Sequence, residues 1–69
     1  MSTVTYVLNN NESITFKWDD LNAFDFLEKV HQTGAELDEG FVEGIEIVSL
    51  NIKYEFPPRL HMNKENPNG

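Results

Sequence analysis

Residues 13–18 alternate strictly between polar and apolar side chains. The apolar positions are Ile14, Phe16 and Trp18, and a period of two residues is typical of a strand with one buried face. From residue 21 onward the spacing of apolar residues changes to three and four, which is the period of an amphipathic helix. This switch favours a fold in which a helix packs against a sheet.

A second segment with β propensity precedes the first. Residues 3–8 are β-branched or aromatic over most of their length. Residues 9–12 are rich in asparagine, which tolerates positive φ and therefore favours a turn. We predict a hairpin in which Val4, Tyr6 and Leu8 share one face.

The helix is predicted to begin at Asp19 or Asp20, because either carboxylate can cap the free amides of the first turn. It is predicted to end at Gly34, a residue suited to the left-handed conformation. The apolar face is expected to consist of Leu21, Phe24, Leu27 and Val30 or His31. The residues expected to be buried together are Phe16, Trp18, Phe24, Leu27 and Ile52.

Residues 35–44 are predicted to form an acidic loop, and residues 45–56 a long strand or two short ones. Apolar residues change phase inside this segment, since Ile47 falls in one phase and Val48 begins the other. Such a change is what a β-bulge or a sharp bend produces. Two prolines, at 57 and 58, are expected to stop the pairing.

These elements predict a small single α+β domain over residues 1–58, in the order β-β-α-β, with one helix packed on a mostly antiparallel sheet. Residues 59–69 are polar and rich in asparagine, and we expect them to be a disordered C-terminal tail.

Composition limits the functions that remain. The chain of 69 residues contains no cysteine, so disulfides and thiolate metal sites are excluded. A core of this size rarely supplies more than about 3–5 kcal/mol, which favours a homodimer over a monomer. No signal peptide and no membrane span is indicated, so we expect a cytoplasmic protein.

The sequence offers little for catalysis or for metal binding. Glu28 and His31 have helical spacing but lack a third ligand. Acidic residues near Gly40 do not follow the spacing of a calcium loop. We find no nucleophile motif and no phosphate-binding loop. We therefore predict no enzymatic activity, no cofactor and no metal.

Charge is the strongest functional indication. Twelve acidic residues stand against five basic ones, for a net charge of −7. This charge opposes direct binding to nucleic acid or to anionic membranes and favours a basic protein partner, although it also suits a face that only keeps the protein soluble. Nine acidic residues are the candidate contacts: Asp19, Asp20, Asp25, Glu28, Glu36, Asp38, Glu39, Glu43 and Glu46.

Two functions follow as hypotheses. The first is a small acidic interaction module, an inhibitor or adaptor that docks on a basic, nucleic-acid-binding protein surface, in its special form as a nucleic-acid mimic. The second is a structural protein with no separate ligand, which assembles into homo-oligomers through an uncovered sheet edge.

Overall fold

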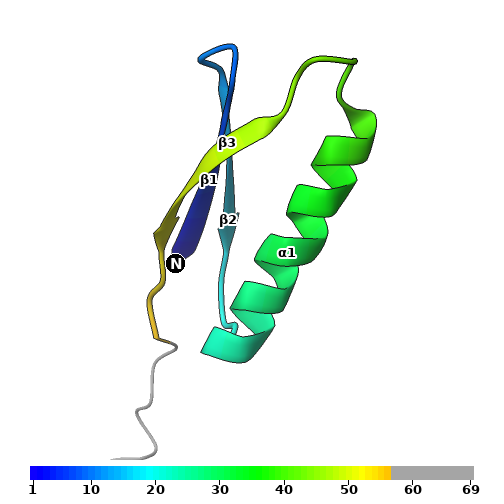
Figure 1. Ribbon diagram of the computed structural model, residues 1–69. Helices are drawn as coiled ribbons and strands as arrows, with labels where there is room; N and C mark the ends of the chain where they lie inside the picture. The colour runs from blue at the N-terminus through cyan, green and yellow to red at the C-terminus, as the bar shows by residue number, and fades with distance from the viewer. Residues whose placement is uncertain (57–69) are drawn as a thin grey trace, which may run out of the picture.

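The computed structural model describes residues 1–56. Its elements, in chain order, are β1 (Ser2–Leu8), β2 (Ser13–Trp18), α1 (Ala23–Gly40) and β3 (Ile47–Lys53). The three strands form one antiparallel sheet, and the helix lies along one face of it (Figure 1). The predicted α+β class and the order β-β-α-β are confirmed. The stop at Pro57 and Pro58 and the tail over residues 59–69 lie outside the described residues.

The hairpin has the predicted pairing. β1 and β2 are antiparallel, with Val4 opposite Phe16 and Tyr6 opposite Ile14. Val4, Tyr6 and Leu8 are all buried. Residues that lie directly opposite each other in antiparallel strands project to the same face, so the apolar residues of both strands meet beneath the helix.

β1 is the central strand, because the order in the sheet is β2-β1-β3. β2 and β3 are therefore parallel to each other and occupy opposite edges. Parallel strands need a long crossover connection, and α1 supplies it by passing over the sheet. The central strand is consequently the most deeply buried element.

β3 contains the predicted irregularity. Val7 pairs with Ser49 and Leu8 pairs with Ile47, so Val48 is an extra residue in the ladder. This bulge explains the change of apolar phase in the sequence. It places Ile47, Leu50 and Ile52 on the face that carries the helix.

The helix begins later and ends later than the sequence predicts. Its N-cap is Asn22, whose side chain accepts a hydrogen bond from the backbone amide of Asp25 at 2.8 Å. Asp20 instead adopts a φ of 61°, a left-handed conformation that aspartate tolerates, so the chain turns there before the helix starts. The helix then continues through Gly34 to Gly40, and the predicted loop over residues 35–44 is wrong for its first six residues.

The predicted buried face is wrong in part: Val30 is buried and Leu21 packs against the core as expected, but three other residues are not buried. Phe24 is 74% exposed, Leu27 is 57% exposed and Ile52 is 42% exposed. The buried helix residues are Phe26 and Val30, while Phe16 and Trp18 are partly buried against this core as expected. The helix is therefore rotated relative to the prediction, toward a face that continues to Leu37.

Tyr6 explains why the helix is rotated and why it continues past Gly34. Its hydroxyl donates a hydrogen bond of 2.7 Å to the backbone carbonyl of Val30. A Cβ placed at Gly34 would lie only 3.3 Å from Cε2 of the Tyr6 ring. Glycine at this position lets the ring approach the helix backbone, and the strong helix formers that follow it allow the helix to continue.

The N-terminal end of the helix is fastened to the end of β3. The Tyr54 hydroxyl donates to the backbone carbonyl of Leu21 at 2.8 Å. Nearby, the amine of Met1 contacts the carboxylates of Glu55 and Asp19. The hydrogen bond from the amine lowers the pKa of Glu55, and that same contact raises the pKa of the amine.

The rotated helix face predicts opposite results for two phenylalanines of one helical turn. Phe26→Ala should lower the free energy of unfolding by about 3–5 kcal/mol, which is about the whole stability expected for a core of this size. Phe24→Ala should change it by less than about 0.5 kcal/mol, as at an ordinary surface position. Urea denaturation measures both, and a larger loss for Phe24→Ala would contradict the fold.

Tyr6 predicts a pH dependence. Burial raises the pKa of its hydroxyl above the ordinary 10.0, and a hydrogen bond with the Thr33 side chain lowers this pKa by a smaller amount. The fold favours the protonated form, so its stabilisation is complete below pH 10 and is lost as the pH rises through the raised pKa. Tyr6→Phe should cost about 1 kcal/mol at pH 8. Between pH 9 and 11 the urea midpoint should fall more steeply for the native chain than for Tyr6→Phe, and parallel curves would contradict this role.

Candidate protein-interaction site

The fold places the nine candidate acidic residues in three regions, and all nine are exposed. Asp19 and Asp20 lie between β2 and α1, and Glu43 and Glu46 lie between α1 and β3. The helix itself carries the other five: Asp25, Glu28, Glu36, Asp38 and Glu39. The structure therefore concentrates on one rigid helix several carboxylates that the sequence assigned to a loop.

Four of these helical residues form one line, which we call the acidic stripe: Asp25, Glu28, Glu36 and Glu39. At about 3.6 residues per turn they fall within about 80° of arc on one side of the helix, and only Glu28 and Glu39 point nearly away from the buried Phe26. The stripe runs from residue 25 to residue 39, and the fourteen steps between them correspond to about 21 Å of helix axis. Asp38 lies outside the stripe, about 80–100° around the helix axis from Glu28 and Glu39, on the side of the helix nearer to β3.

The last turn of the helix is electrostatically unfavourable. It contains Asp38 and Glu39 and no basic residue, although the C-terminal end of a helix dipole is negative. Asp25, in the first turn, is favourably placed by the same argument. Within residues 1–56, the ion pairs are those of the Met1 amine, so none of them neutralises the stripe or Asp38.

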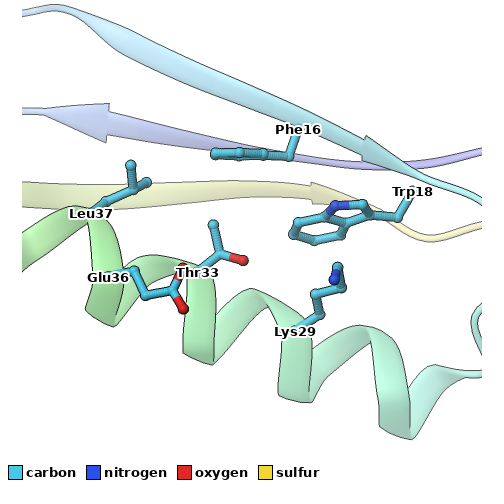
Figure 2. Close-up of a pocket in the computed structure, with 6 residues that line it drawn as sticks. All are labelled: Phe16, Trp18, Lys29, Thr33, Glu36 and Leu37. Atoms are coloured by element: carbon cyan, nitrogen blue, oxygen red, sulfur yellow. The ribbon is translucent and has the colours of Figure 1, made fainter.

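A groove runs between the helix and β2, with a volume of about 310 Å³. The residues that line it are Phe16, Trp18, Lys29, Thr33, Glu36 and Leu37. Figure 2 shows the Phe16 and Trp18 rings on the strand and the polar side chains on the helix opposite them. The Nζ atom of Lys29 lies 5.5 Å from the centre of the Trp18 ring, a cation–π distance. This groove joins the stripe at Glu36.

A second groove, which we call the β3 groove, lies between the helix and β3 and has a volume of about 430 Å³. Its lining is mainly apolar: Tyr6, Leu27, Val30, His31, Gly34, Ala35, Ile47, Leu50 and Ile52. The sequence did not predict this groove, because Leu27 and Ile52 were assigned to the core. One signal in the sequence could have indicated the groove: the strands and the helix carry more apolar residues than a single helix can cover on three strands.

The structure changes the metal hypotheses. His31 is exposed in the middle of the helix and lines the β3 groove. Glu36, Asp38 and Glu39 lie on a helix, so they do not form the loop that a calcium site of that kind requires. Among residues 1–56, no three histidine, aspartate or glutamate side chains are grouped so as to hold a metal ion.

Comparison with known proteins gives no match: no family model, no curated protein and no solved structure is significantly similar to the chain. In the part of the chain that the structure describes, no helix is both long and apolar enough to cross a membrane.

The helix dipole predicts a stability test. Asp38→Asn and Glu39→Gln should each raise the free energy of unfolding by about 0.3–1 kcal/mol, because each removes a negative charge from the negative end of the dipole. Asp25→Asn, the matched control in the first turn, should lower it by a similar amount. Urea denaturation at low salt measures the differences, and 1 M NaCl should shrink them. Destabilisation by either C-terminal substitution would contradict the argument.

Proposed function

We propose that the chain is a small, non-catalytic interaction module that docks on a basic protein surface through the acidic stripe, joined at the C-terminal end of α1 by Asp38. The observation that carries this proposal is the pair Asp38 and Glu39 at the C-terminal end of α1, where no basic residue of the last turn compensates them. Charges that serve only solubility can stand anywhere on a surface. These two stand where they oppose the helix that carries them.

A cationic partner would remove this conflict. An arginine or lysine placed near Asp38 and Glu39 would pair with the carboxylates and would also interact favourably with the last carbonyl groups of the helix. Binding would therefore recover stability that the free protein lacks. The two carboxylates are thus unfavourable in the free protein and would be favourable in a complex, which supports a role in docking.

The form of the stripe favours a partner that normally binds nucleic acid. Four carboxylates follow one side of the helix over about 21 Å, and proteins that track a nucleic-acid backbone present basic residues in an extended row. In this role the chain would act as an inhibitor or adaptor that occupies the basic surface.

Of the three lysines in residues 1–56, Lys29 lies on α1 beside the stripe, with its Nζ atom over the Trp18 ring, and the other two support the same orientation. Lys17 and Lys53 both pair across Thr3, in one row of the sheet, on the face away from the helix. The stripe therefore lies on the opposite side of the molecule from these two cations. Such separation of charge orients an approaching basic partner toward the helix and speeds encounter.

The test begins with proteins retained by the immobilised chain from its native source at low salt and released at high salt. For a purified partner, Kd is then measured over a range of salt concentrations. The variant Glu28→Gln/Glu36→Gln/Glu39→Gln should raise Kd about tenfold or more and flatten its salt dependence, since each lost pair removes part of the electrostatic attraction.

The matched control is Glu12→Gln/Asp19→Asn/Asp20→Asn. Both triple variants have a net charge of −4, three units above the native −7, but the control leaves the stripe intact. Its Kd should stay within about twofold of the native value. Equal weakening by both variants would show that only net charge matters, and an unchanged Kd in the first would exclude the stripe as the contact.

A further inference from the structure

The outer edge of β3 lacks a partner within residues 1–56. β3 pairs with β1 on one side only, because it is an edge strand of the sheet. An edge strand presents unpaired amide and carbonyl groups, and proteins usually protect it with prolines, charged side chains, β-bulges or a covering element. β3 has no proline, its bulge lies at Val48 near one end, and its only charged residue is Lys53 at the other end.

The side chains of the same strand are also incompletely covered. Leu50 is 48% exposed and Ile52 is 42% exposed, although both lie on the face that the helix occupies. The helix passes over β1, so the β3 groove stays open beside it. An unpaired backbone edge and an open apolar groove therefore adjoin along one strand.

We propose that this surface binds a second copy of the chain. Two β3 strands would pair antiparallel about a two-fold axis near Leu50, which joins two three-stranded sheets into one of six strands. Each copy would supply apolar side chains that close the β3 groove of the other. Both copies would therefore use the same surface patch, as a two-fold interface requires. No acidic residue is among those that line the groove.

Charge complementarity within the chain selects this partner and this direction. Glu46 directly precedes β3 and Lys53 ends it. Antiparallel self-pairing centred on Leu50 brings Lys53 of each copy next to Glu46 of the other, twice in the dimer. Parallel pairing would instead place like charges together. A second copy thus matches the edge in hydrogen bonding, apolar content and charge.

The test of the interface is sedimentation equilibrium of the full chain at 1–100 μM. We expect a dimer of twice the 8.0 kDa chain mass. Leu50→Lys should raise the dissociation constant at least tenfold, because it places a charge in the groove. Asn51→Lys, the adjacent residue on the opposite face, adds the same charge and should leave dimerisation nearly unchanged. Circular dichroism establishes that both variants are folded.

Charge exchange tests the direction of pairing. Lys53→Glu and Glu46→Lys should each weaken the dimer several-fold, and the double variant should restore it with the native net charge. Lys17→Glu is the matched control on the opposite edge and should have no effect.

Three results would overturn the proposal. The first is a monomer at 100 μM, whether the groove stays open or is filled by residues 57–69. The second is a dimer that tolerates both Leu50→Lys and Lys53→Glu. The third is a double charge exchange that fails to restore a dimer weakened by the single ones.

Discussion

The contact between Tyr6 and the helix backbone determines where everything else lies. Tyr6 is in the central strand, its ring packs edge-on against Phe16, and its hydroxyl reaches the carbonyl of Val30. Gly34 supplies the space for this approach. Because the ring fixes both the height and the rotation of the helix over β1, it decides which side chains are buried and which stay at the surface.

The position of the helix over β1 creates the functional surfaces. A single helix cannot cover three strands, so a groove opens on each side of it. The rotation turns Phe26 inward and directs the acidic stripe outward. It also extends the helix to Gly40, which places Asp38 and Glu39 at the negative end of the dipole. The proposed docking surface and the proposed dimer surface therefore have the same structural origin, and the acidic stripe lies on the side of the helix away from the β3 groove.

Local patterns were sufficient for the strands and insufficient for the helix. Alternation predicted the hairpin, and the change of apolar phase at Val48 predicted either a bulge or a sharp bend, of which the structure has the bulge. The helical segment contains two apolar faces, one through Phe24 and one through Phe26, and spacing alone does not choose between them. The choice depends on Tyr6, distant in sequence, and on Gly34, which looked like a stop signal. The sequence also identified the acidic residues, but their position on one side of the helix depends on the contact between Tyr6 and the helix.

The most direct test of this account is a NOESY experiment on the native chain. Close contact of the Tyr6 ring with the helix predicts strong cross-peaks from the Tyr6 ring protons to the α protons of Gly34. The ring centres of Trp18 and Phe26 lie 6.0 Å apart, so cross-peaks between these two rings are also expected. If the Tyr6 peaks to Gly34 are absent and the Trp18 or Tyr6 ring instead shows cross-peaks to Phe24, the helix is rotated the other way and the account is wrong.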